Sequence, residues 1–514
     1  MKKLSSLLIA LAAVLSLGVS CNKTEQPGQG GGGGTSTAET KTRKAVNHFG
    51  KNVMQVYYLW NREISSDIFG WKMDEEPIEK VYKIRYKQNG KDVDRWTQMT
   101  DDYDGFTSSV SGISETYGFD FLLYMVDQTQ TAVCCVITFV YAGSPAEKAG
   151  LKRGDCIMTV NDKKLLVAGS QYVDILNNDI FGNTHVKFGM DGGATVELDA
   201  VKMYEDPVNL YKVLDVDGKK VGYLHFTSFT LKACDRLIEA CKYFKANAVE
   251  DVVLDLRYNG GGYVFTMGLL ASMLAPAADV RAGGVLEKEV YNSILSEELA
   301  SQADTKLSFK HSMKTSDGQT LSYDTEDANV GEARIWAILS SGSASASESL
   351  LTCLMPYVPI KIVGEQSHGK FCTGIMYGAE DWYNDYKNTA LVSSAQYANG
   401  MKYAKNWGIY VMIGRFADKN GDTPCMPDGF KPDYAVKDNP ADPTPLGDPN
   451  EAMLAKVISL IKGEPQAGGS EADKRRAPLG REPFDYRIER PDFGKYILTK
   501  DELTRAFPQL PPAR

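Results

Sequence analysis

Apolar and polar positions follow each other along this chain in a way that predicts both helices and strands. Between residues 46 and 57 an apolar side chain recurs every three or four positions, which predicts an N-terminal helix that packs through one face. The largely apolar runs at 221–226, 252–256 and 335–339 predict buried strands. An amphipathic segment at 237–244 lies between the first two runs and predicts a helix. Strands and helices that alternate in this order are typical of an α/β core.

The run at 335–339 leads into a turn of small residues. Residues 343–348, with the sequence Ser-Ala-Ser-Ala-Ser-Glu, place Ser345 at a predicted helix start, where unpaired backbone N–H groups can face a developing oxyanion. Lys370 follows 25 residues after Ser345, and a desolvated lysine with a lowered pKa can take the proton of a serine nucleophile. Spacing alone leaves a second interpretation open, because Ser345-x-x-Glu348 is also an ordinary helix capping box and Lys370 could be a solvated lysine.

Three consecutive glycines, at positions 260–262, follow the predicted strand at 252–256. Consecutive glycines let backbone N–H groups approach a ligand closely, although a tight turn needs the same residues. The turn becomes informative because Ser345 lies on a second turn of the same predicted core.

These motifs resemble the active-site signature of the C-terminal processing peptidases, which are also called tail-specific proteases. The match includes residues 343–348, Gly364-Glu365 and Gly369-Lys370, and further blocks extend it over about residues 115–440. The resemblance implies an α/β multidomain protein, with a crotonase/ClpP-like α/β protease core, an inserted or preceding PDZ-like β domain and a small helical N-terminal module. It also implies a serine endopeptidase that cleaves protein or peptide substrates, with bonds near their C-termini as one option, and that uses no cofactor.

The resemblance assigns a role to each residue of the candidate site, position by position. It makes Ser345 the nucleophile and Lys370 the general base. Glu348 matches an acid of the family that could support this pair. The amides of Gly261 and Ala346 would hold the oxyanion, with the preceding glycine as the alternative to Gly261.

Two positions depart from the family pattern. Many members carry a glutamine four residues after the lysine, where it orients the base, and here that position is Gly374. His368 lies two residues before Lys370, where the family usually has an apolar or aromatic residue. Since a Ser–His pair is the commoner hydrolase solution, a hydrolase with His368 as its base is one alternative. A non-catalytic peptide-binding lipoprotein that keeps the protease scaffold is another, and Gly374 is the feature that favours it.

Residues 115–205 resemble a PDZ domain, and residues 144–155 match the helix and turn of bacterial protease PDZ domains. The residues at the expected carboxylate-binding loop are Tyr117, Gly118 and Phe119. In this fold a glycine-rich loop offers N–H groups to a chain terminus, and the adjacent strand edge pairs with the peptide. Asp120 places an acid near the expected carboxylate, so a packing module that gates the active site without binding chain termini remains an alternative.

Composition narrows the class of protein. A chain of 514 residues is too long for one compact core, and its 43% hydrophobic and 24% charged residues are ordinary for a globular protein. The net charge of -9 argues against nucleic acid as a main partner. Neither a CxxC nor an HExxH pattern occurs, so we predict no metal site. The eight cysteines after Cys21 lack regular spacing and are predicted to be buried thiols.

The N-terminus has the pattern of a targeting segment. Lys2 and Lys3 precede an apolar stretch at 4–19, and small residues precede Cys21, which resembles the lipidation site of bacterial lipoproteins. We therefore predict an exported protein of the bacterial cell envelope, periplasmic or surface-facing, that is held to a membrane by a lipid on Cys21. The predicted organisation is a signal peptide at 1–20, a Gly/Ser/Thr-rich tether at 21–43, the helical module at 44–110, the PDZ-like domain at 115–205, the protease core at 206–463 and a C-terminal extension at 464–514.

Overall fold

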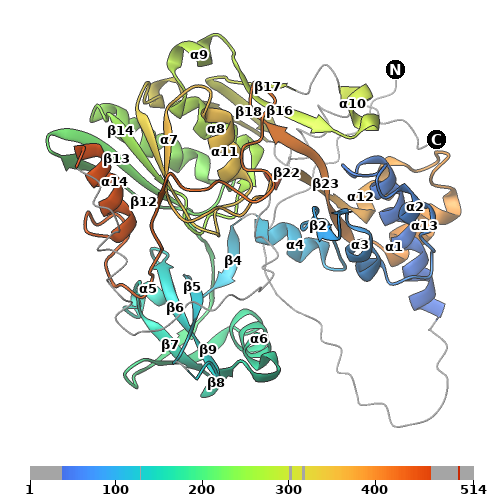
Figure 1. The fold of residues 1–514 in the computed structure, drawn as a ribbon. Coiled ribbons are helices and arrows are strands. Elements are labelled where there is room, and N and C mark those ends of the chain that lie inside the picture. Colours follow the sequence, from blue (N-terminus) through green and yellow to red (C-terminus); the bar gives the residue numbers. More distant parts are fainter. Residues whose placement is uncertain are drawn as a thin grey trace.

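The computed structural model describes residues 37–110, 112–127, 129–299, 304–314, 319–464 and 496–497. The predicted signal peptide, the lipidation site Cys21 and most of the predicted tether and C-terminal extension lie outside these ranges. The described chain forms an N-terminal helical part, a small β domain and a larger α/β core (Figure 1). In these ranges, no helix combines the length and the apolar character that crossing a bilayer requires.

The N-terminal part is mainly helical, as its apolar spacing predicts. Helix α1 spans Thr37–Val56 and so begins within the predicted tether, where an ion pair of 2.6 Å between Arg43 and Glu39 joins successive turns. The other elements of this part are α2 (Ser65–Phe69), α3 (Pro77–Ile84), β1 (Lys87–Gln88), β2 (Lys91–Asp92), β3 (Gln98–Thr100) and α4 (Tyr103–Val110).

The N-terminal part shares its hydrophobic core with the α/β core. Helix α1 lies beside α12 (Ala379–Asp385) and α13 (Ser394–Tyr403), as Figure 1 shows for these blue and orange helices. The rings of Phe49 and Trp382 lie 5.8 Å apart in this contact. Strand β3 also pairs with β23 (Gly408–Ala417) of the core. The predicted helical module is therefore one packed body with the core.

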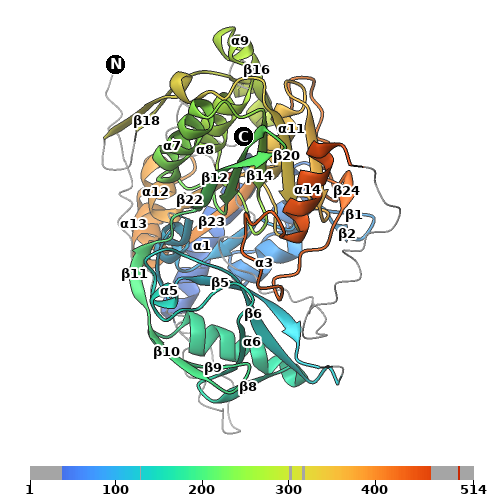
Figure 2. The ribbon, with the colours of Figure 1, turned by 90° about the vertical axis from the view of Figure 1, so that its left-hand side faces the viewer.

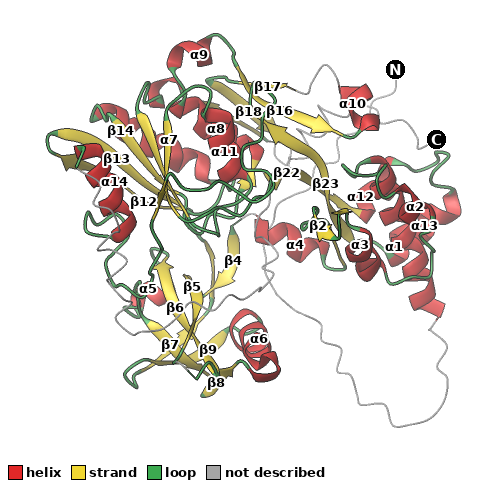
Figure 3. Cartoon of the chain, in the orientation of Figure 1, coloured by secondary structure: helices red, strands yellow, loops and turns green. Residues whose placement is uncertain are grey.

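The β domain has a hydrophobic core of its own. Its six-stranded sheet has the order β10-β9-β7-β8-β6-β5, so β5 lies at one edge, and the domain lies below the larger core in Figure 3. The elements of this domain are β4 (Ile113–Thr116), β5 (Phe119–Met125), β6 (Ala132–Val140), α5 (Pro145–Lys148), β7 (Cys156–Val160), β8 (Lys163–Leu166), α6 (Gln171–Ile175), the π-helical turn η2 (Leu176–Phe181), β9 (His185–Met190), β10 (Thr195–Asp199) and β11 (Val201–Tyr204).

The first sheet of the α/β core has the order β12-β13-β14-β20-β21-β24. Its strands are β12 (Val208–Val216), β13 (Lys219–Phe226), β14 (Asp251–Asp255), β20 (Arg334–Leu339), β21 (Ile360–Gly364) and β24 (Tyr434–Ala435). The helices that accompany it are α7 (Ala233–Ala246), α8 (Val264–Leu274), α11 (Ala346–Leu354) and α14 (Ala452–Lys462). Side chains alternate across β14, so Val252 and Leu254 pack with α7, α8 and α11 while Val253 packs with α14. Figure 2 shows α7 and α14 on opposite sides of the sheet.

Parallel pairing in this sheet brings the predicted site together. Strands β14, β20 and β21 run parallel, so the turns that follow them meet at one edge of the sheet. The glycine turn follows β14, Ser345 follows β20 and Lys370 follows β21. Motifs far apart in the sequence therefore become neighbours because each stands directly after a strand of the same sheet.

A second sheet crosses the core beside the site and has the order β15-β25-β22-β23-β16-β17. Strand β22 begins just after Lys370 and pairs antiparallel with β23. The remaining elements are β15 (Gly262–Tyr263), α9 (Ala277–Arg281), β16 (Val285–Tyr291), α10 (Ser293–Leu299), β17 (Asp304–Lys306), β18 (Lys310–Lys314), β19 (Thr320–Asp324), β22 (Cys372–Gly378) and β25 (Tyr496–Ile497).

Buried polar contacts join the β domain to the core. The Arg153 guanidinium donates to Asp438 Oδ1 at 2.9 Å and to the Tyr258 hydroxyl at 3.0 Å. Arg257, which is fully buried, also donates to Asp438. Charged groups that are buried in this way are paired, because an isolated buried charge is very costly.

Candidate active site

Ser345 lies on a strained turn between β20 and α11. Its backbone has φ 63° and ψ -110°, a conformation that residues with a side chain rarely adopt and that costs on the order of 1–3 kcal/mol. The side chain is fully buried, and Ser345 Oγ has no hydrogen-bond partner among the described residues. Buried hydroxyl groups are normally hydrogen-bonded, so the unbonded Ser345 Oγ is unusual, although Ser345 and Glu348 also have the arrangement of a helix capping box.

The Glu348 carboxylate ties the nucleophile turn to the lysine loop. Its Oε2 atom accepts from the N–H groups of Ser345 (3.0 Å) and Lys370 (2.8 Å). Its Oε1 atom accepts from the Ser367 hydroxyl (2.6 Å) and the Gly369 N–H (2.7 Å). Glu348 therefore holds the backbone of the nucleophile turn and the backbone of the lysine loop together.

The environment of Glu348 shifts its titration toward neutral pH. Burial raises the pKa of the Glu348 carboxyl to about 7, and the hydrogen bonds from Ser367, Gly369, Ser345 and Lys370 oppose this rise. The carboxylate is thus fully ionised only above neutral pH.

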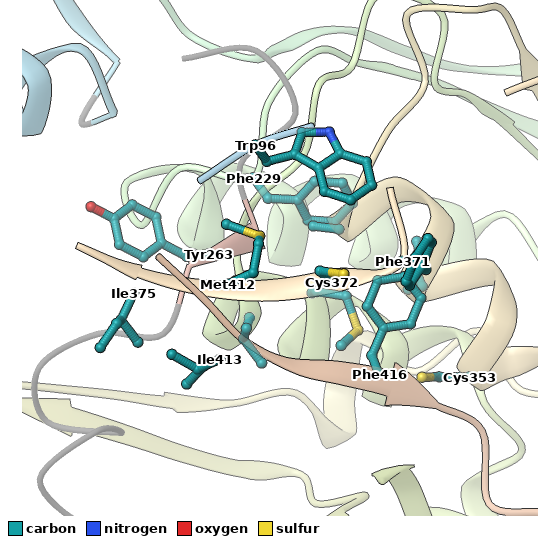
Figure 4. Close-up of a cluster of buried hydrophobic side chains, with 14 of the residues drawn as sticks. Trp96, Phe229, Tyr263, Cys353, Phe371, Cys372, Ile375, Met412, Ile413 and Phe416 are labelled. Atoms are coloured by element: carbon teal, nitrogen blue, oxygen red, sulfur yellow. The ribbon is translucent and has the colours of Figure 1, made fainter. Parts of the chain in front are cut away.

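The amine of Lys370 lies in a buried aromatic environment. The side chain is fully buried, and its Nζ atom donates to the hydroxyl of Tyr410 at 2.7 Å. Nζ also lies 5.8 Å from the ring centroid of Trp96, which comes from the N-terminal part. Figure 4 shows Trp96 and Phe371 beside the side chains of β22 and β23, including Met412. The amine is therefore enclosed by the Tyr410 hydroxyl and by aromatic rings from two parts of the chain.

The glycine turn contacts the nucleophile turn through Asn259. The carbonyl of Asn259 accepts from the Ala344 N–H at 3.0 Å and from the Ser347 hydroxyl at 3.1 Å. The Gly261 N–H donates to Asn259 Oδ1 at 2.9 Å, so in this state that amide is occupied. The Gly260 N–H donates to no described residue.

The second predicted oxyanion amide belongs to a helix start. Ala346 is the first residue of α11, and N–H groups of a first helical turn have no intrahelical acceptor. Ala346 directly follows Ser345, and the glycine turn contacts the same nucleophile turn through Asn259.

His368 faces the N-terminal part of the chain. Its Nε2 atom accepts from the Trp96 indole N–H at 3.4 Å, and its backbone N–H donates to the Ser343 carbonyl at 2.9 Å. His368 therefore contacts the nucleophile turn through its backbone and the N-terminal part through its ring.

The predicted peptide-binding residues lie in the β domain, before the edge strand β5. Gly118 has φ +84°, and a Cβ there would lie 2.0 Å from Ser144 Cβ, so only glycine fits this turn. The Gly118 N–H donates to the Thr116 hydroxyl at 2.9 Å. Tyr117 is buried and Phe119 packs on Phe188. These residues shape the loop, and the free edge of β5 is the feature that an extended peptide could pair with.

Three contributors to the site have no motif of their own in the sequence. They are Tyr410, Ser367 and Asn259. Asn259 stands directly before the glycines, and an Asx residue beside a glycine turn is a recognisable signal. Tyr410 lies 40 residues after Lys370, and only the pairing of β22 with β23 brings it close.

Comparison with known proteins defines the class of the two domains. Residues 220–436 match the model of peptidase family S41, and residues 136–179 match that of a PDZ domain. The chain therefore contains a peptidase family S41 domain and a PDZ domain. The predicted resemblance and the α/β multidomain fold class are both confirmed.

Individual relatives are similar to this chain at low identity. The chain is 24% identical over 349 residues to a probable CtpA-like serine protease of Staphylococcus aureus, covering 65% of this chain and 62% of the relative. It is 24% identical over 232 residues to a carboxyl-terminal-processing protease of Picosynechococcus, covering 44% of this chain and 49% of the relative. The chain thus spans about 62% of the length of the S. aureus relatives it matches.

One solved structure supports the fold. A putative S41 protease from Bacteroides fragilis aligns with a TM-score of 0.57 at 22% identity, covering 80% of this chain and 97% of that chain. The photosystem II D1 C-terminal processing protease gives a TM-score of 0.43 at 18% identity, covering 83% of this chain and 99% of that chain.

Proposed function

We propose that this chain is a serine endopeptidase that cleaves protein substrates through Ser345 and Lys370. The observation that carries the proposal is the pair of hydrogen bonds from the Ser345 and Lys370 N–H groups to one oxygen of Glu348. A capping glutamate needs only the first of these bonds, whereas a site that must hold a nucleophile and a base together needs both. The buried, unbonded Ser345 hydroxyl supports the same conclusion.

The proposed reaction is acyl transfer in two halves. Ser345 Oγ attacks the scissile carbonyl carbon while Lys370 Nζ accepts the hydroxyl proton, and the protonated lysine then returns it to the leaving amine. The N–H groups of Ala346 and of the glycine turn stabilise the oxyanion, through Gly260 or through Gly261 once its bond to Asn259 is exchanged. Water hydrolyses the acyl-enzyme by the same route, so the reaction needs no cofactor.

We further propose that substrates are extended protein chains. Strand β5 lies at the edge of the PDZ sheet and can pair with an extended segment. The similar proteins named carboxyl-terminal-processing protease and CtpA-like serine protease support cleavage near substrate C-termini. A packing role for this domain instead predicts that cleavage does not depend on the substrate terminus.

Cleavage of an unfolded reporter protein with an apolar C-terminal tail tests the proposal. A form that starts at residue 22 would be compared with its Ser345→Ala and Lys370→Ala variants. We expect cleavage by the parent form alone. Binding without cleavage by all three forms would favour the peptide-binding alternative, and cleavage that survives in Lys370→Ala but not in His368→Ala would favour the histidine.

We also propose that the protein is exported and lipid-anchored at Cys21, on the strength of the basic and apolar residues before it. The full chain should incorporate radiolabelled palmitate in a bacterial host and fractionate with membranes. Cys21→Ser should lose the label and appear in the soluble envelope fraction. An unlabelled full chain would contradict this part of the proposal.

A further inference from the structure

The hydroxyl of Tyr410 is a polar partner of the Lys370 amine, with Nζ donating to it at 2.7 Å. Tyr410 is almost fully buried, and its strand is held on both sides: Tyr410 pairs with Met376 of β22 and with Gln98 of β3. Because the backbone on which it stands is fixed by two neighbouring strands, the hydroxyl has a defined position relative to Lys370.

Gly374 creates the space that Tyr410 occupies. A Cβ at position 374 would lie 2.6 Å from two ring atoms of Tyr410, Cε2 and Cζ, and 2.6 Å from Met412 Cε. Real Cβ atoms do not approach other atoms so closely, so any side chain here would displace the Tyr410 ring or Met412. The glycine thus allows the ring to lie across β22 and to reach the lysine loop.

An amine that acts as a base must direct its lone pair at the nucleophile. A hydroxyl that accepts one N–H of Lys370 restricts rotation of the amine, and after proton transfer it stabilises the ammonium. Tyr410 stands in the middle of a sheet, so it performs both tasks without reorganising. Tyr410, on the neighbouring strand, therefore takes the orienting role for which Gly374 has no side chain.

We propose that Tyr410 is the positioning residue for Lys370 and that Gly374 is the residue that admits it. This inference rests on the proposed Ser345/Lys370 peptidase. In the sequence, Gly374 favoured a non-catalytic protein. In the structure, the same glycine is required for Tyr410 to reach Lys370.

The test compares Tyr410→Phe, which removes only the hydroxyl, with Tyr377→Phe as a matched control. Tyr377 is a buried tyrosine of β22 whose hydroxyl donates to Asp385 at 2.8 Å. Loss of a hydrogen bond to a charged group should lower kcat of Tyr410→Phe about 10- to 100-fold, with KM changed less than about twofold. The acidic limb of its rate profile should move to lower pH, because the ammonium has lost an acceptor. Tyr377→Phe should change neither.

Two further variants separate positioning from folding. Gly374→Ala should lower kcat because its Cβ displaces the Tyr410 ring. In Tyr410→Ala the ring is absent, so adding Gly374→Gln supplies an amide carbonyl in the vacated space and should recover about tenfold in kcat over Tyr410→Ala alone. Gly374→Leu in the same background fills the space without a carbonyl and should give no rescue, whereas equal rescue by leucine would show that Tyr410 only filled space.

Several results would overturn the inference. Wild-type kcat and an unmoved acidic limb in Tyr410→Phe would do so, and so would a loss of activity that merely tracks the folded fraction. If the wild type and Ser345→Ala are equally inactive, the proposed peptidase itself fails, and this inference fails with it. Failure of the proposed peptidase can be told apart from failure of this inference, because the comparison of the wild type with Ser345→Ala involves no Tyr410 variant.

Discussion

Replacing Glu348 by glutamine changes one oxygen into an NH₂ group and leaves the shape of the side chain almost intact. Each carboxylate oxygen accepts from two donors, so the new NH₂ must face two of them. At the Oε2 side these are two backbone N–H groups, of Ser345 and Lys370, neither of which can accept. At the Oε1 side one of the two is the Ser367 hydroxyl, which can accept as well as donate.

The glutamine should therefore turn its nitrogen toward Ser367, which leaves the Gly369 N–H and the Ser367 O–H without the oxygen to which they now donate. An unpaired buried donor costs about 1–3 kcal/mol. We expect Glu348→Gln to lower the free energy of unfolding by at least that amount at pH 8, where the parent carboxylate is ionised. Glu348→Ala removes all four acceptor contacts and should cost about 4 kcal/mol or more.

Activity should depend on whether the Ser345 and Lys370 N–H groups keep an acceptor, and not on the negative charge of Glu348. Glu348→Gln keeps one oxygen on the Ser345 and Lys370 N–H groups, so its kcat/KM should fall only about tenfold, whereas Glu348→Ala should fall at least about 100-fold. Since the pKa of Glu348 is raised to about 7, the parent profile should show an inflection near pH 7 that Glu348→Gln lacks.

The assay pairs urea unfolding at pH 8 with hydrolysis of a quenched peptide between pH 5 and 9. Glu365→Gln in the same loop, where the side chain is only half-buried, is the control and should change neither quantity appreciably. Equal stability and equal activity of Glu348→Ala and the parent chain would refute the reasoning, because four buried contacts would then have no energetic weight.

Three further predictions concern the surroundings of the site. Asn259→Ala frees the Gly261 N–H but loosens the glycine turn, so kcat should fall about 10- to 100-fold with little change in KM, and an unchanged kcat would contradict a role in holding the turn. Burial lowers the pKa of His225 to about 4, so between pH 6.5 and 4 the folded chain binds fewer protons than the unfolded chain. The free energy of unfolding should therefore be highest above pH 6.5 and should fall by about 3 kcal/mol in total as the pH falls toward 4. Urea unfolding of His225→Gln should not show this fall in stability. If the stability of the parent chain and of His225→Gln depends on pH in the same way, this prediction is wrong. Arg153→Met removes one partner of Asp438 and should destabilise the PDZ–core contact by about 3–5 kcal/mol, seen as faster proteolysis between the domains; an unchanged cleavage rate would count against it.

The sequence was sufficient to predict the elements that carry the site, because each motif follows an apolar run. The strands at 252–256 and 335–339 are present as β14 and β20, and the turns after them hold the glycines and Ser345. The buried state of the eight cysteines is also confirmed. The roles assigned to Ser345 and Lys370 stay predictions that the cleavage experiment tests.

Other features depend on contacts between distant segments and have no local signal. Trp96 and Tyr410 reach Lys370 from the N-terminal part and from β23, and neither apolar spacing nor motif length indicates this. The packing of residues 44–110 on the core could not be predicted from the sequence either. A helix with one apolar face looks the same whether its partner is its own module or, as here, the helices α12 and α13.

Hydrogen bonds to backbone groups hold the site together more than hydrogen bonds between side chains do. Glu348 binds three N–H groups, Asn259 binds the nucleophile turn through its carbonyl, and the Ser345 backbone is kept at a positive φ. Strain of this kind persists only where the surroundings fix it, and Glu348 with Asn259 fix it from two sides. The Lys370 side chain differs, because its amine donates to a side-chain hydroxyl from another strand. The direction of the proposed base should therefore be sensitive to changes at Tyr410.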